Sequence, residues 1–197
     1  MFRHKDKFAI LLLSNFILLF VASSSSANNV QSIFDVSSND TDNRVNYGIQ
    51  LNPDCLIGET NPVYSYVRKA NGETRPLNSL EQDVYKISQS VVSNNKVQLV
   101  FDSLQSRGLQ RPITVTTSKL NDKSCQVSAF TVINDTRTQL VSVYVQVSRT
   151  VVEIPLVGKK TIGGTLHSIM FIGSNQNKEE IQCPSNCSMG LSSQNGT

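Results

Sequence analysis

Apolar and polar residues alternate along much of the chain. In the segment QLVSVYVQVSR, residues 139–149, one parity holds four valines, Val141, Val143, Val145 and Val147, and the other holds Ser142, Tyr144, Gln146 and Ser148. A period of two is typical of a strand with one buried face and one solvent-facing face. We therefore predict a half-buried strand here, with the valines towards the core.

Other segments show the same alternation, or short runs rich in β-branched residues. They are residues 48–51, 63–67, 87–92, 97–101, 112–117, 125–133, 151–154 and 166–172. Turns rich in Asn, Ser and Asp separate several of them, as at 93–96 and 134–136. The class predicted is all-β, a single antiparallel β-sandwich or barrel-like domain with one short helix.

The helix is expected at residues 79–86. Asn78 can accept a hydrogen bond from the amide of Glu81 while the Glu81 carboxylate reaches back, which is a capping box. Leu80, Val84 and Ile87 follow at i, i+4 and i+7, so they share one face. We expect a helix of about two turns, packed over an open end of the sheet.

The first 27 residues have the layout of a secretory signal. A basic start leads into an apolar run from Phe8 to Ala22, and small residues continue to Ala27. Because a spanning helix needs roughly 20 apolar residues, we predict cleavage after Ala27, with a retained N-terminal anchor as the alternative. The mature protein would be periplasmic or secreted, with no stable membrane anchor.

The mature chain divides into a core and two tails. Residues 28–46 and 174–197 are rich in Ser, Asn, Gln and Asp and hold few apolar residues. Such segments bury too little surface to offset their ordering entropy, which predicts a flexible N-terminal tail and a polar C-terminal tail. Residues 47–173 remain as one β-domain, which is long enough for a single hydrophobic core.

The charge balance argues against a nucleic-acid partner. The full chain has 18 Lys and Arg against 15 Asp and Glu, and residues 1–27 hold three of the basic and one of the acidic residues. The mature chain therefore carries a net charge of about +1. Nucleic-acid binding would need basic residues clustered on a face or stripe, which the sequence does not show.

Four cysteines remain in the mature chain, and an even number in an exported protein predicts disulfides. Three connectivities are possible. We favour Cys55 with Cys125, and Cys183 with Cys187, because the segment CPSNC can close on itself through Pro184. A redox role for the second pair is the alternative, although its spacing is not the C-x-x-C of thiol oxidoreductases.

No catalytic constellation stands out. His167 is the single histidine of the mature chain, so a zinc site built on histidines lacks ligands. No metal and no cofactor are expected. A thiol- or His-dependent hydrolytic enzyme would need His167 to work with Cys125 or with a nearby serine.

The tyrosines are the most plausible binding material. The set is Tyr47, Tyr64, Tyr66, Tyr85 and Tyr144. On a polar sheet face they could form a platform for a sugar, a peptide or an envelope protein. Ordinary cross-strand packing is the simpler interpretation and is favoured for the set as a whole. Tyr64, Tyr66 and Arg68 are the residues for which we predict ligand contact.

Several short motifs carry a family resemblance. They are residues 61–64 (NPVY), 76–77 (PL), Glu81, 85–87 (YKI), 111–113 (RPI), the strand from Cys125, and the later stretch EIPLVGKKTIGG. Over roughly residues 47–173 the chain resembles the bacterial domain-of-unknown-function family 4833 (DUF4833). The resemblance implies an exported, mostly β protein. It supplies no activity and no catalytic residues.

Three functional hypotheses follow. The preferred one is an exported, non-enzymatic β-domain that binds or scaffolds an envelope protein, peptide or glycan. The second is the hydrolytic enzyme based on His167. The third is an adaptor that offers an edge strand to another chain, for which the segment ITVTTS, residues 113–118, has suitable composition.

Overall fold

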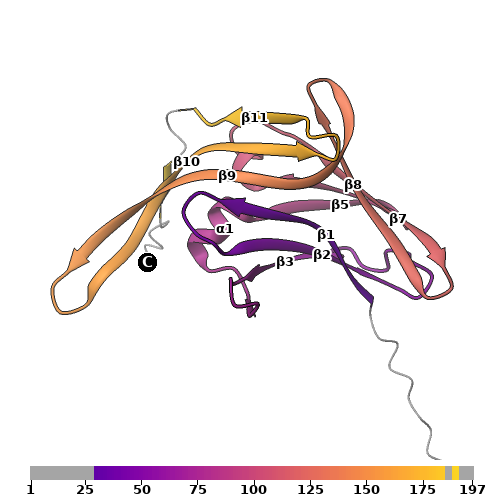
Figure 1. The fold of residues 1–197 in the computed structure, drawn as a ribbon, viewed down its shortest axis with the longest axis horizontal. Helices are drawn as coiled ribbons and strands as arrows, with labels where there is room; N and C mark the ends of the chain where they lie inside the picture. Colours follow the sequence, from indigo (N-terminus) through magenta and orange to yellow (C-terminus); the bar gives the residue numbers. More distant parts are fainter. Residues whose placement is uncertain (1–28, 185–187, 191–197) are drawn as a thin grey trace, which may run out of the picture.

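The computed structural model describes residues 29–184 and 188–190 and is built almost entirely of strands (Figure 1). The strands are β1 (Asn29–Ser38), β2 (Arg44–Leu51), β3 (Val63–Arg68), β4 (Thr74–Arg75), β5 (Ile87–Ser93), β6 (Lys96–Phe101), β7 (Ile113–Asn121), β8 (Ser124–Ile133), β9 (Thr136–Ile154), β10 (Gly158–Gly173), β11 (Lys178–Gln182) and β12 (Ser188–Gly190). The helices are α1 (Ser79–Tyr85) and α2 (Asp102–Gln105). The expected signal, residues 1–27, lies outside the described part.

The strands form one large, mixed sheet. Its hydrogen-bonded order is β4-β3-β2-β1-β9-β8-β7-β6-β5, and β10 branches from β9 and pairs in turn with β11 and β12. Neighbouring strands are antiparallel except for β1 and β9, which run parallel where residues 35–38 meet residues 142–145. The sheet is therefore largely but not wholly antiparallel.

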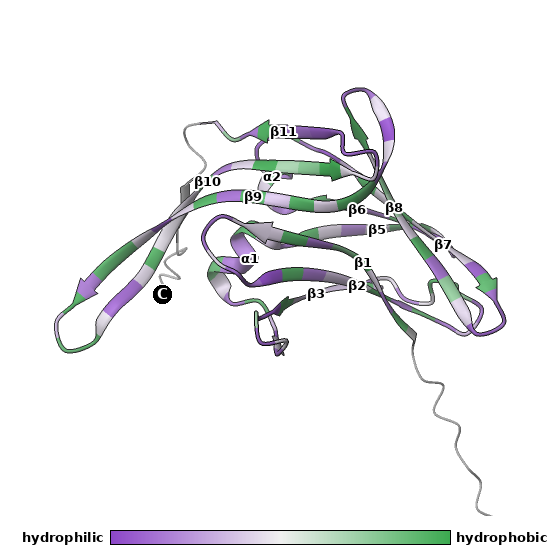
Figure 2. Ribbon diagram, in the orientation of Figure 1, coloured by the Kyte–Doolittle hydropathy of each residue, from purple (hydrophilic) through white to green (hydrophobic). Residues whose placement is uncertain are grey.

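The sheet folds over, so that its two halves enclose one core. The ring of Tyr47 on β2 meets the ring of Phe101 on β6 edge-on at 6.0 Å between centroids. Phe101 in turn meets Phe171 on β10 at 6.3 Å. All three residues are buried, and apolar side chains from both halves of the sheet join them in a single cluster. Figure 2 shows how apolar positions recur along these strands.

The sheet remains open, which decides between the two architectures expected. The all-β class is confirmed, but no barrel closure occurs because the backbones of β3 and β5 are not paired. A side chain bridges them instead. The Gln89 amide nitrogen donates to the Val63 carbonyl, and its oxygen accepts from the Val63 amide, each at 2.9 Å.

Residues 28–46 were expected to be a flexible tail, but residues 29–38 and 44–46 belong to the sheet. β1 lies between β2 and β9, and its Phe34 and Val36 are buried in the core. Most of the other residues of the strand are polar, which is why its composition resembles that of a tail. Part of the predicted C-terminal tail is likewise ordered, because β11 pairs with β10.

The predicted valine face is wrong at one residue, Val141, because β9 has a β-bulge there. Val143, Val145 and Val147 are buried, whereas Val141 is 51% exposed. Ser142 pairs with Ile172 and Leu140 pairs with Gly173, so Val141 is the extra residue between them. An extra residue reverses the parity of the strand, because successive side chains point to opposite faces.

Helix α1 begins with the predicted capping box. The Asn78 side chain accepts from the Glu81 amide at 2.9 Å, and the Glu81 carboxylate accepts from the Asn78 amide at 2.9 Å. The helix buries Val84 and Tyr85 against the core. A second helix, the single-turn α2, was not predicted. In the described residues, no helix has the length and apolar character needed to span a bilayer.

The predicted disulfide between Cys55 and Cys125 is present, with the Cα atoms 5.4 Å apart. It ties the loop after β2 to β8 across 70 residues of sequence. The Thr117 hydroxyl strengthens this link by donating to the Cys55 carbonyl at 2.7 Å. Cys183 is also disulfide-bonded, but its predicted partner, Cys187, lies outside the described residues.

Replacing Cys55 and Cys125 together by serine should lower the free energy of unfolding by about 4 kcal/mol, because the bond closes a long loop in the unfolded chain. Urea denaturation of the oxidised protein measures this. The matched control replaces Cys183 and Cys187, for which the short loop predicts a loss of about 2 kcal/mol. If the loss of unfolding free energy for Cys55 and Cys125 were equal to or smaller than that of the control, the bond would not be the main covalent stabiliser of the core.

Candidate binding surface

Strand β3 places Tyr64, Tyr66 and Arg68 on its outer face, since Val63 and Val67 on the other parity are buried. The two tyrosine rings stack with their centroids 6.2 Å apart and their planes inclined by 25°. The structure thus brings together the residues for which ligand contact is predicted, and adds an offset aromatic stack that the sequence does not specify.

Gly48 on β2 fixes the position of the first tyrosine. A Cβ atom at residue 48 would lie 2.9 Å from the Tyr64 hydroxyl oxygen and 3.0 Å from Cζ. The ring therefore lies across the β2 backbone at a place that only glycine leaves free. Partial burial and the neighbouring Tyr66 raise the pKa of Tyr64, so its hydroxyl is protonated at neutral pH.

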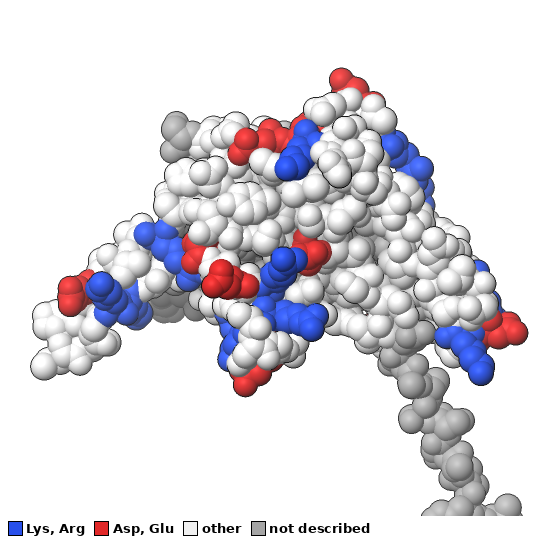
Figure 3. All heavy atoms as spheres, in the orientation of Figure 1, with Lys and Arg blue, Asp and Glu red and all other residues white. Residues whose placement is uncertain are grey.

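A hollow of about 550 Å³ opens on the outer face of β1 and β2, next to these residues. Its lining includes Arg44, Arg68 and Lys69, together with Asp35 and Asp42. Figure 3 shows basic side chains gathered beside acidic ones in the region of β2 and β3. The hollow is therefore polar and holds charges of both signs.

The cations of this hollow are only partly neutralised. Arg44 and Arg68 are direct cross-strand partners, and like charges at opposed positions repel each other. Arg44 has an ion pair with Asp35 at 2.7 Å. No ion pair involving Arg68 is found among the described residues. An anionic group bound beside Arg68 would offset the repulsion.

Sequence reasoning missed Arg44 and Asp35 because both lie in the stretch assigned to a tail. The alternation of Val45, Tyr47 and Ile49 was available as a signal that the strand begins near residue 44. Extending that strand would have placed Arg44 on the outer face. The opposition of Arg44 and Arg68 depends on the β2–β3 register and could not be read from either segment alone.

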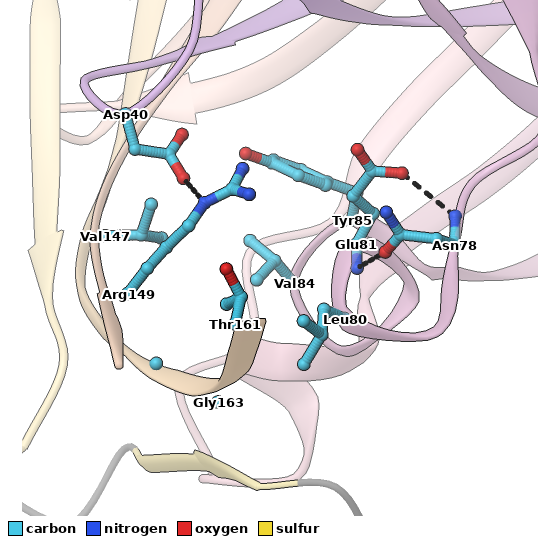
Figure 4. Close-up of a pocket in the computed structure, with 11 residues that line it drawn as sticks. Asp40, Asn78, Leu80, Glu81, Val84, Tyr85, Val147, Arg149, Thr161 and Gly163 are labelled. Atoms are coloured by element: carbon cyan, nitrogen blue, oxygen red, sulfur yellow. Dashed lines mark hydrogen bonds and ion pairs between the residues drawn. The ribbon is translucent and has the colours of Figure 1, made fainter. Parts of the chain in front are cut away.

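A second cavity, of about 30 Å³, lies where α1 meets β9 and β10 (Figure 4). Arg149 reaches from β9 towards the Tyr85 ring and forms an ion pair with Asp40. On the helix side, the Glu81 carboxylate accepts a hydrogen bond from each terminal nitrogen of Arg75, both at 2.6 Å. This space has room for on the order of one or two water molecules.

The ion pairs of the second cavity have a structural role. Both carboxylates, Asp40 and Glu81, are engaged by arginines, so neither is poised as a general base. Burial opposes ionisation of Glu81, but its hydrogen bonds to Arg75 and Asn78, with the charges of Arg75 and Arg149, lower its pKa overall. The cluster secures α1 against the strands.

The tyrosines do not form one platform. Tyr47 is fully buried, and Tyr85 is buried beside it. The Tyr47 hydroxyl donates to the Tyr85 carbonyl, and burial, with Tyr85 and Asp102 nearby, holds the pKa of Tyr47 well above its ordinary value. Tyr64 and Tyr66 stack on the outer face. The packing interpretation therefore holds for Tyr47 and Tyr85, and ligand contact stays a prediction for Tyr64 and Tyr66.

His167 lies at a bulge of β10 and is exposed. Its Nε2 is 3.0 Å from the Ser148 hydroxyl, while Cys125 is held in a disulfide. The thiol version of the hydrolytic hypothesis therefore has no free Cys125. The serine version has a close histidine, but no carboxylate is hydrogen-bonded to it in the described part. No cluster of three potential metal ligands occurs there either.

The edge-strand hypothesis also meets a structural limit. Residues 113–116 of β7 pair with β6 on one side, and most of the strand pairs with β8 on the other. The segment ITVTTS is therefore largely an interior strand. An adaptor of this kind would have to use another strand.

The comparisons with known proteins identify the class. The model of a family described as "Domain of unknown function (DUF4833)" matches residues 34–168. The chain belongs to this family, as its motifs suggested, and the family has no known function. No curated protein and no solved structure matches the chain.

The stability of the protein should fall as the pH drops through the lowered pKa of Glu81. The folded state holds this pKa below the ordinary value of 4.5, so the ionised carboxylate stabilises the fold above that pH and the contribution is lost below it. Glu81→Gln should cost about 1–2 kcal/mol at pH 7, with little difference from the parent in acid. Chemical denaturation at several pH values measures this.

Asp83→Asn is the matched control, because Asp83 lies exposed on the same helix. It should change the free energy of unfolding by less than about 0.5 kcal/mol. Equal losses for the two variants would mean that the Glu81 interactions contribute nothing specific.

Proposed function

We propose that this protein is an exported, non-enzymatic binding domain whose outer face holds an acidic glycan of the cell envelope. The observation that carries the proposal is the juxtaposition of the Tyr64–Tyr66 stack with Arg68, beside a polar hollow of about 550 Å³. A tyrosine ring offers a flat apolar surface with a polar rim, which suits the face of a sugar ring.

The charge of the site favours an anionic ligand over a neutral one. Arg68 stands opposite Arg44 in the ladder, and only Arg44 has a carboxylate partner at hydrogen-bonding distance among the described residues. A guanidinium binds a carboxylate through two parallel hydrogen bonds. A uronic acid residue would present its ring to a tyrosine and its carboxylate to Arg68.

Export is supported by two independent features. Residues 1–27 have the composition of a cleavable leader. The bond between Cys55 and Cys125 requires an oxidising compartment to form and persist. Together they favour a periplasmic or secreted location for the mature protein.

A uronic acid oligomer, hexameric oligogalacturonate, should bind to the oxidised protein, and neutral maltohexaose should not. Arg68→Gln should weaken binding about tenfold, because a charge-assisted hydrogen bond is lost. Tyr66→Ala should weaken it also, through loss of the stacking surface. Isothermal titration calorimetry at two salt concentrations measures these changes, and higher salt should lower the affinity.

Lys123→Gln is the matched control, since it removes one exposed positive charge from the β7–β8 turn, away from the hollow. The affinity of this variant for the oligogalacturonate should equal that of the parent protein. Equal binding of the neutral sugar, or equal weakening by Lys123→Gln and Arg68→Gln, would overturn the proposal.

A further inference from the structure

The hairpin formed by β9 and β10 extends far beyond the rest of the sheet, as an arm that projects from the body (Figure 1). We call residues 150–162 the arm. Among the residues that the structure describes, β9 and β10 pair only with each other within the arm, since β12 joins β10 at residues 163–165 and β1 joins β9 at residues 142–145. A two-stranded ribbon is marginally stable on its own. Binding to a partner would therefore stabilise the arm.

The tip of the arm is apolar and exposed to solvent. Leu156 is fully exposed and Val157 is 73% exposed. Behind them, Val151 and Ile162 are also exposed. In Figure 3 the end of the arm is uncharged, and charged side chains begin behind it. Since exposed apolar side chains are costly when they cluster, this tip is a candidate contact surface.

The backbone of the tip adds a second, independent observation. The Val157 amide donates to the Ile154 carbonyl at 3.1 Å, closing a turn with Pro155 and Leu156 at its centre. Leu156 has φ 67°, a left-handed conformation. This position of the turn normally takes glycine or asparagine, and a leucine there is strained. The turn therefore presents an apolar side chain to solvent at a position where a glycine would present none.

The charges behind the tip select the partner. Lys159 and Lys160 are exposed on β10 directly after the turn, and only Glu153 on the facing strand opposes them. Lysines can keep their ammonium groups at a charged surface while their carbon chains follow the apolar tip. Such a pattern matches a lipid interface with anionic headgroups.

A folded protein partner fits the tip less well. Two side chains on a convex turn bury far less than the roughly 1,000 Å² that a stable protein interface needs. A lipid interface needs no complementary pocket, because it deforms around the inserted side chains and gains free energy with each buried methylene.

We propose that the arm docks the protein on an anionic membrane surface, with Leu156 and Val157 entering the lipid interface and Lys159 and Lys160 contacting the headgroups. This proposal does not depend on the acidic glycan site, because no residue of the arm lines the hollow or belongs to β3.

The chain contains no tryptophan, so a single introduced one reports on its own surroundings. Val157→Trp should show a blue-shifted emission on mixing with vesicles of equal phosphatidylglycerol and phosphatidylcholine, and no shift with phosphatidylcholine alone. Leu120→Trp is the matched control. Leu120 is 66% exposed in the hairpin formed by β7 and β8. There the neighbouring lysine is partly neutralised, because Lys119 Nζ lies 3.6 Å from Asp122 Oδ1. It should show no shift.

Flotation of the otherwise unaltered protein with the same vesicles gives the affinity. Leu156→Gly should weaken partitioning at least about tenfold through loss of a buried leucine. It should also leave the midpoint of urea unfolding unchanged or raised, because glycine accepts the positive φ. The double variant Lys159→Gln, Lys160→Gln should lose the preference for anionic vesicles and the salt dependence of binding.

Three results would overturn the proposal. They are a parent protein that does not float with anionic vesicles, a Leu156→Gly variant that floats as well as the parent, and equal emission shifts at the two hairpins. A sedimentation velocity experiment distinguishes one further outcome. Self-association of the parent that Leu156→Gly abolishes, without vesicle binding, would assign the tip to contact between copies of this chain instead.

Discussion

The packing of Tyr47 holds the fold together, because it joins β2 to β6 and to the end of α1, neither of which pairs with β2 in the sheet. Its ring stacks on Phe34 of β1 at 4.8 Å and meets Phe101 of β6 edge-on. Its hydroxyl donates to the Tyr85 carbonyl at the end of α1. One buried side chain thus links both halves of the sheet to the helix. The hydrogen bond is needed, since an unsatisfied buried hydroxyl would cost about 1–3 kcal/mol.

The position of α1 determines the surroundings of the second cavity. Because Tyr47 fixes the helix end, Glu81 lies where Arg75 can bind it with two hydrogen bonds, and Tyr85 lies beside Arg149. Arg149 is held in turn by Asp40, from the loop between β1 and β2. The base of the arm is therefore anchored to the body through the ion pair of Arg149 with Asp40, while its tip has no such anchor among the described residues.

Local patterns predicted the elements, and long-range pairing determined what they could not. Alternation located most of the strands between residue 48 and residue 172, although not β4. The Asn78–Glu81 box located α1, and cysteine number suggested the bond from Cys55. Strand β1 was missed because just Phe34 and Val36 anchor it. The bulge at Val141 was missed because an inserted residue is defined by its partner strand. For the same reason, Arg68 was selected as a contact residue without its neighbour Arg44.

The Gln89 bridge has a consequence for motion. Between β3 and β5, one amide makes two hydrogen bonds to Val63 where a closed barrel would have a continuous ladder. The free energy needed to separate two elements rises with the strength of the interactions that join them, so β3 and β5 part more readily than two strands joined by a full ladder. Since β3 carries the stacked tyrosines, breathing between β3 and β5 would tilt that aromatic surface as a unit, hinged on β2.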